Sequence, residues 1–92
     1  MLESKMKRRI VSRMSREKPT VWIGKSGVTA QLISEIDKQL SKRETVKVKV
    51  LRSALTKKSV SEIATEVSKK TESSPITIRG HTFILYRPKK PL

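Results

Sequence analysis

The sequence predicts an α/β fold, a two-layer sandwich in which helices cover one face of a mixed four-stranded sheet. Helical and strand-like hydrophobic patterns alternate along the 92 residues, in the order α-β-α-β-α-β-β. The early strands are separated by helices, which are the connections that parallel pairing requires. The last two strands follow each other directly, so they are expected to pair antiparallel.

The first helix is expected over residues 3–16. Its apolar side chains Met6, Ile10 and Met14 recur every four residues, and Pro19 follows its end. A neighbouring side of this helix is basic and carries Lys5, Arg9, Arg13 and Arg16. This side is either a solvated surface or a basic ridge beside the turn that follows.

A short apolar strand at residues 20–23 leads into a glycine-containing turn, and a helix follows with Thr29 as its expected N-cap. The turn consists of Gly24, Lys25, Ser26 and Gly27. Glycines allow a tight turn, and a helix start presents free amides at the positive end of its dipole. Lys25 adds a mobile positive charge, so the turn is predicted to bind a phosphate. Trp22 is either a stacking platform for a base or part of the core, and we predict the core.

The remaining elements follow from the same two periodicities. They are a helix at 29–43, a strand at 45–51, a loop at 52–58, a helix at 59–70 and a hairpin of strands at 76–79 and 82–86. Ser59 and Glu62 fit a capping box at the start of the last helix. Lys47 and Lys49 alternate with valines, so they are predicted on a wet, positive face of the sheet.

The composition favours a polyanionic partner. Twenty-two Lys and Arg residues against eight Asp and Glu give a net charge of +14, which is the electrostatic footprint of a nucleic-acid binder. Binding to a membrane surface is disfavoured, because the chain has one Trp, one Tyr and one Phe and no run long enough to span a bilayer. The lack of cysteine excludes disulfides and fits a cytoplasmic location.

Enzymatic chemistry is not predicted. The segment beginning at Gly24 resembles the end of a nucleotide-binding P-loop, but Pro19 stands where that motif needs another glycine. His81 is the only histidine, so a metal site is not expected, and nothing positions a catalytic nucleophile. We therefore expect no catalytic residue, no metal, no cofactor and no small-molecule substrate.

Several blocks of sequence stand in one order between residues 18 and 88. They are Lys18-Pro19, Ile-Gly-Lys-Ser-Gly-Val-Thr at 23–29, Glu-Ile-Asp at 35–37, Glu-Thr-Val-Lys-Val-Lys at 44–49 and Gly-His-Thr-Phe-Ile-Leu-Tyr-Arg-Pro at 80–88. Together they resemble the CRM domain (chloroplast RNA splicing and ribosome maturation), in the small stand-alone form of the YhbY-like proteins. The chain departs from the family pattern at Trp22, where a polar residue is common, and over residues 51–59.

The resemblance implies a fold like the C-terminal domain of bacterial translation initiation factor 3. It also implies RNA binding through residues 24–27 and the neighbouring basic surface. Stand-alone bacterial members of the family associate with precursors of the large ribosomal subunit, and plant members promote group II intron splicing. A comparable role here would make ribosomal RNA or a precursor particle the partner.

The sequence thus predicts a monomeric, non-enzymatic RNA-binding protein that acts in large-subunit assembly or in RNA folding and splicing. One domain is expected over residues 1–88, with a flexible basic tail at 89–92. Beyond the turn, the predicted RNA-binding residues are Lys5, Arg9, Arg13, Arg16, Lys47, Lys49 and Arg87. Two alternatives stay open: an architectural protein that coats nucleic acid, as Alba-type chromatin proteins do, and a permanent ribosomal protein.

Overall fold

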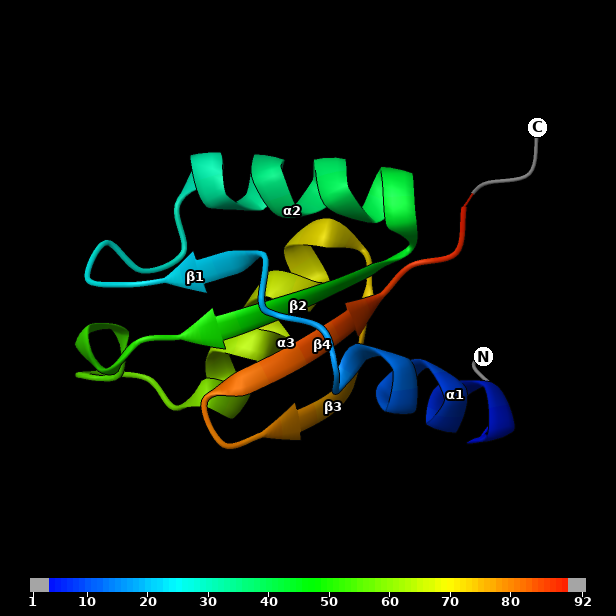
Figure 1. Cartoon of the computed structure of the whole chain (residues 1–92). Coiled ribbons are helices and arrows are strands. Elements are labelled where there is room, and N and C mark those ends of the chain that lie inside the picture. Colours follow the sequence, from blue (N-terminus) through cyan, green and yellow to red (C-terminus); the bar gives the residue numbers. More distant parts are fainter. Residues whose placement is uncertain (1–3, 90–92) are drawn as a thin grey trace.

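The fold is a four-stranded sheet with three helices, described here from a computed structural model over residues 4–89 (Figure 1). The elements are α1 (Ser4–Met14), β1 (Val21–Ile23), α2 (Ala30–Arg43), β2 (Thr45–Val50), a 3₁₀ turn η1 (Arg52–Ala54), α3 (Val60–Thr71), β3 (Ser74–Arg79) and β4 (Thr82–Tyr86). Their order confirms the predicted fold class. Residues 1–3 of the predicted domain and 90–92 of the predicted tail lie outside the described residues.

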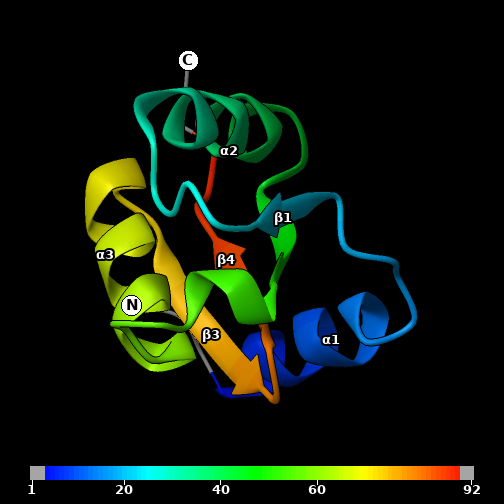
Figure 2. The same cartoon turned by 90° about the vertical axis from the view of Figure 1, so that its left-hand side faces the viewer.

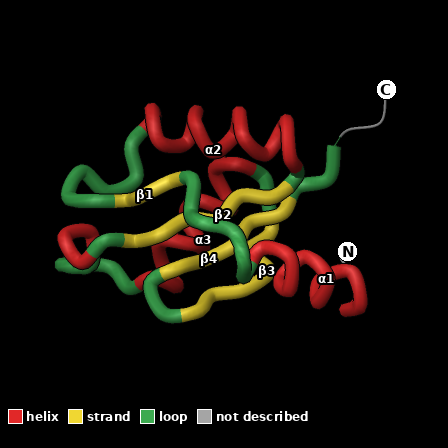
Figure 3. Tube along the Cα trace, viewed as in Figure 1, coloured by secondary structure: helices red, strands yellow, loops and turns green. Residues whose placement is uncertain are grey.

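The sheet has the strand order β1-β2-β4-β3 (Figure 3). β1 and β2 are parallel and are joined through α2, whereas β4 runs antiparallel to both of its neighbours. The chain crosses from β2 through α3 to β3 and then returns along β4 into the centre of the sheet. The hairpin of β3 and β4 was predicted, and its first strand begins earlier than expected, at Ser74.

The main core lies between the sheet and the layer formed by α2 and α3. Alternating residues of the strands meet the apolar stripes of both helices, as their periodicities predicted. The buried cluster comprises Val21, Ile23, Ile36, Leu40, Val46, Val48, Val50, Ile63, Ala64, Val67, Phe83 and Leu85. Burial of these side chains is the main force that holds the two layers together.

α1 lies on the opposite face of the sheet, so the prediction that all helices cover one face is wrong for this element (Figure 2). Ile84 points away from the main core because it alternates with Phe83 and Leu85 along β4. It is buried in a second, smaller cluster with Ile10 and Met14 of α1 and with Ile76 of β3. The amphipathic α1 therefore shields this apolar side chain of the outer sheet face from water.

α1 is also shorter than predicted, since it ends at Met14 and not at residue 16. Within its expected apolar stripe, Ile10 and Met14 are buried but Met6 is 44% exposed. The helix therefore covers one end of the outer sheet face with its C-terminal half. None of the helices among residues 4–89 has both the length and the apolar character that a membrane crossing requires.

Candidate nucleic-acid interface

Three connections meet at one edge of the sheet, which we call the loop edge (Figure 1). They are residues 24–27 after β1, residues 51–59 after β2 and the turn at residues 80–81 between β3 and β4. β1 and β2 are parallel, so their carboxyl ends and the following helix starts gather there. The backbone N–H of Leu51 donates to the carbonyl of Ile23 at 2.8 Å, which joins the first two connections.

Residues 24–27, which we call the GKSG turn, form a tight, exposed turn. The N–H of Gly27 donates to the carbonyl of Gly24 at 2.8 Å. Gly27 has a φ of +70°, a conformation that strongly favours glycine, although nothing lies near the position of a Cβ. Lys25 and Ser26 are exposed at the tip. The side chains of Lys25 and Ser26 therefore point into solvent, and neither forms a hydrogen bond or ion pair with another residue among 4–89.

The start of α2 follows this turn, and no negative side chain in its first turn neutralises the positive end of the helix dipole. Thr29 is its N-cap, as predicted, and accepts a hydrogen bond from the N–H of Leu32 at 3.1 Å. The first turn of α2 contains no acidic residue. Its remaining first-turn amides and the positive end of the dipole are therefore available to an external anion.

The start of α3, by contrast, already has an acidic side chain at the positive end of its dipole. Ser59 and Glu62 form the predicted capping box, in which the Ser59 N–H donates to the Glu62 carboxylate at 3.1 Å. This hydrogen bond, together with that of the Ser59 hydroxyl, lowers the pKa of Glu62. A carboxylate thus already occupies the positive end of α3. Of the two helix starts at the loop edge, that of α2 is the one suited to a phosphate.

The basic residues of the first helix do share one side of the molecule, but this side does not lie beside the GKSG turn. Lys5, Arg9 and Arg13 lie on α1 and Arg16 in the turn after it, and all four line one shallow hollow. They are exposed, yet α1 covers the end of the sheet away from the loop edge (Figure 1). The interpretation of a ridge next to the turn is therefore wrong, and the outer sheet face separates the two basic regions.

Lys47 caps α1 and does not point into open solvent. Its Nζ donates to the carbonyls of Met14 at 3.0 Å, Ser15 at 3.4 Å and Glu17 at 2.8 Å. These groups lie at and just after the C-terminus of α1, where a positive charge complements the helix dipole. The prediction of a wet position is wrong for Lys47, because α1 folds over this part of β2. Lys49, two residues further along, is exposed as predicted.

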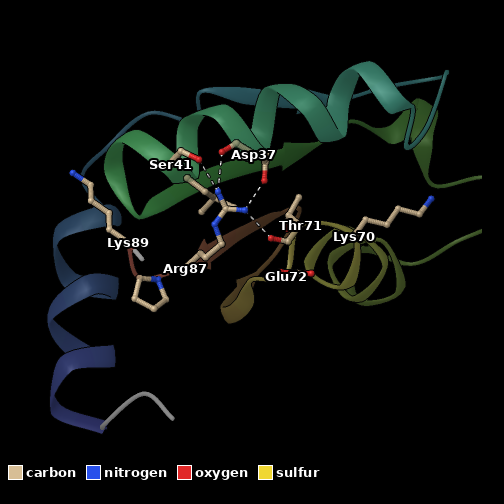
Figure 4. Close-up of a pocket in the computed structure, with 9 residues that line it drawn as sticks. Asp37, Ser41, Lys70, Thr71, Glu72, Arg87 and Lys89 are labelled. Carbon is tan, nitrogen blue, oxygen red and sulfur yellow. Dashed lines mark hydrogen bonds and ion pairs between the residues drawn. The ribbon is translucent and has the colours of Figure 1, made fainter. Parts of the chain in front are cut away.

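Arg87 ties the C-terminal parts of α2 and α3 together (Figure 4). Its guanidinium donates to the Thr71 carbonyl at 2.9 Å, the Asp37 carbonyl at 3.0 Å and the Ser41 hydroxyl at 2.9 Å. It also forms an ion pair with the Asp37 carboxylate. The side chain is only 21% exposed. Arg87 thus serves the fold, at the end of the molecule opposite the loop edge.

Trp22 was predicted to be in the core and is instead 54% exposed. Its neighbours Val21 and Ile23 face the main core, so the indole lies on the other side of β1. Sequence reasoning also missed Arg79, which is exposed at the loop end of β3. Trp22 and Arg79 belong to one row of paired positions across the sheet. The sequence does not specify the order of the strands, so this row could not be predicted.

No group of three or more acidic, histidine or cysteine side chains that could hold a metal ion occurs in residues 4–89. His81 lies exposed in the turn between β3 and β4. The exposed side chains at the loop edge include the cations Lys25, Lys49 and Arg79.

Comparison with known proteins places this geometry in a family. The model of the CRS1/YhbY (CRM) domain matches residues 2–87. A Methanocaldococcus jannaschii protein named as a probable RNA-binding protein is 36% identical over 89 residues, which are 97% of this chain and 66% of that protein. A Bacillus subtilis protein with the same kind of name is 32% identical over 90 residues, covering 98% of this chain and 92% of the relative.

A solved structure agrees with these relatives. The solution structure of a Staphylococcus aureus protein superposes with a TM-score of 0.78 and 34% sequence identity, covering 99% of this chain and 93% of the other. The same sheet and helices are therefore found in a related sequence. With a family model over nearly its whole length and relatives above 30% identity, the chain belongs to the CRS1/YhbY (CRM) domain family.

Proposed function

We propose that this protein binds RNA and that the GKSG turn, with the start of α2 behind it, is its principal phosphate site. The observation that carries the proposal is the exposed turn in front of a helix start that has no acidic residue. The net charge of +14 supports it. So do the relatives, since those from M. jannaschii, B. subtilis and Haemophilus influenzae are named as RNA-binding proteins.

The exposed basic residues outside the turn add to the attraction of the protein for RNA without being part of this phosphate site. We assign a general electrostatic contribution to Lys5, Arg9, Arg13, Arg16 and Lys49. Lys47 and Arg87 are left out, because their donors are already used within the fold. A protein that neutralises about six phosphates should show a slope of log affinity against log salt of roughly −4 to −5.

We further propose that the bound RNA is ribosomal RNA or a precursor of the large subunit, and that the protein acts as a monomeric, non-enzymatic assembly factor in the cytoplasm. This assignment rests on the resemblance of its sequence blocks to stand-alone members of the family. An assembly factor should sediment with precursor particles and be absent from mature ribosomes. Sedimentation with mature ribosomes would instead favour a permanent ribosomal protein.

A charge reversal in the turn tests the phosphate site. The variant Lys25→Glu/Ser26→Asp places two carboxylates where the phosphate is expected, and both positions are exposed. We expect affinity for a labelled ribosomal RNA fragment to fall at least tenfold in fluorescence anisotropy, with an unchanged circular-dichroism spectrum.

The matched control is Thr65→Asp/Lys69→Glu, which makes the same change in charge at exposed positions of α3. Both doubles lower the net charge equally, so only a local effect can separate them. If the two variants lose the same affinity, binding depends on net charge alone and the GKSG turn is not the site. Unchanged affinity in the turn variant contradicts the proposal equally.

A further inference from the structure

The half of the outer sheet face next to the loop edge is left uncovered by α1. Four residues form a row across it, one from each strand. The register pairs Trp22 with Lys49, Lys49 with Thr82, and Thr82 with Arg79. Paired residues of neighbouring strands point to the same face of a sheet, so these side chains lie side by side. With strands about 4.8 Å apart, the row is roughly 14 Å long.

Three of the four side chains in the row are open to solvent. Trp22 is 54% exposed, and Lys49 and Arg79 are exposed as well. No hydrogen bond or ion pair joins the side chain of any of these three residues to another residue in 4–89. α1 covers only the other half of this face, where it packs on Ile76 and Ile84.

The chemistry of the row fits one class of ligand. An exposed indole offers a flat apolar surface on which any nucleobase can stack. The two cations lie on one side of the indole along the row, where they suit successive phosphates of the strand that carries the base. Trp22 is also two residues before Gly24, so a chain held by the GKSG turn can reach the row. The hollow beside Trp22, which continues along α2 to Lys38, adds room for the rest of the nucleotide.

We propose that Trp22 is a stacking platform for one unpaired RNA base, and that Lys49 and Arg79 hold the backbone of that strand as it crosses the open half of the sheet. The inference rests on the proposed RNA binding and deepens it, because a base can stack on the sheet only if it is not paired in a duplex. A second copy of the chain is disfavoured as the occupant, because each copy would bring the same positive charges to the contact.

The single tryptophan of the chain makes the platform directly observable. A 12-nucleotide single-stranded RNA should quench the Trp22 fluorescence of the full chain, and a blunt RNA duplex of equal length, at matched occupancy, should leave it nearly unchanged. Equal quenching by both RNAs would overturn the proposal. A change in fluorescence with protein concentration alone, with dimers in sedimentation, would show that another copy covers Trp22 and would overturn it too.

Substitution then measures the contribution of the ring. Trp22→Ala should weaken binding of the single-stranded 12-mer about 5- to 150-fold, the range found for loss of one base–aromatic stack, and duplex binding by less than about twofold. Trp22→Phe, which keeps an aromatic face, should recover most of the affinity. Loss of the same size for both RNAs, or no recovery with Phe, would contradict stacking.

The turn variant Lys25→Glu/Ser26→Asp separates this inference from the proposed function. It should weaken both RNAs, because phosphates are common to both. If it does so while Trp22→Ala changes neither, the stacking platform is wrong and the phosphate site stands. If the wild-type chain binds neither RNA, both proposals fail.

Discussion

Arg87 offers a direct test of how the structure divides its basic residues between the fold and the proposed RNA surface. The variant Arg87→Met removes the guanidinium but keeps most of the length of the side chain. It leaves the carbonyl of Thr71 without its donor at 2.9 Å, and it breaks the contacts with Asp37 and Ser41. All these acceptors lie in α2 or α3 (Figure 4).

The size of the effect follows from the exposure of each partner. Thr71 is 2% exposed, so its carbonyl loses a hydrogen bond to a charged donor, worth roughly 1.5–3 kcal/mol. The Asp37 side chain is 55% exposed, so its ion pair contributes at most about 1 kcal/mol, and water can replace much of it. We therefore expect a loss of about 2–3 kcal/mol in the free energy of unfolding. For a domain of this size, the melting temperature should fall by roughly 10–20 °C.

Urea denaturation followed by circular dichroism measures this loss, and Arg79→Met is the matched control. Arg79 is exposed and has no partner in residues 4–89, so its replacement should change stability by less than about 0.5 kcal/mol. RNA affinity should show the reverse order, with Arg79→Met weakened and folded Arg87→Met close to wild type. A stable Arg87→Met variant that binds RNA less well than Arg79→Met would refute the structural role of Arg87.

Three further substitutions test other parts of the structure. Lys47→Met should lower the free energy of unfolding by about 1–3 kcal/mol in urea denaturation, because the carbonyls at the end of α1 lose their donor; an unchanged midpoint would show that this contact does not form in solution. Glu72→Gly should raise stability by about 1 kcal/mol in thermal melts, since Glu72 holds a φ of +53° that glycine adopts without strain; a lower melting temperature would contradict this. Ion pairs with Lys58 and Lys70 lower the pKa of Glu66 below its ordinary value of 4.5. The two pairs therefore stabilise the fold above pH 4.5, and this stabilisation is lost as the pH falls through the lowered pKa. Glu66→Gln should flatten the acid limb of the curve of stability against pH, and an identical limb would show that the pairs contribute nothing.

The order of elements and the helix caps could be predicted because they are local properties of the sequence. Hydrophobic periods of two and of about four residues mark strands and helices, and Thr29 and Ser59 mark helix starts. The hairpin of β3 and β4 required only two apolar runs around a turn. These signals need no knowledge of which elements meet in space.

The placement of α1 could not be predicted in the same way. The run Thr82–Tyr86 is apolar on both faces, which is typical of a strand that is covered on both sides. The sequence does not say which helix covers the second face. The pattern of Met6, Ile10 and Met14 is equally compatible with either face of the sheet.

The lysines of β2 show why the candidate site was only partly predictable. Lys47 and Lys49 have the same sequence environment, alternating with valines, and differ only in whether the end of α1 lies above them. Trp22 presents the same difficulty, because β1 has apolar residues on both faces and the positions of all three helices decide which of them stays exposed. The exposure of a side chain depends on tertiary contacts that periodicity does not specify.

The most direct test of RNA binding at the loop edge is an NMR titration of the labelled protein with the single-stranded 12-mer. The backbone amides of residues 24–27 and of the first turn of α2 should shift most, together with the indole N–H of Trp22. Those of the C-terminal half of α3 should move little. Shifts confined to α1, or spread evenly over the basic surface, would contradict the account, because they would show binding without the GKSG turn.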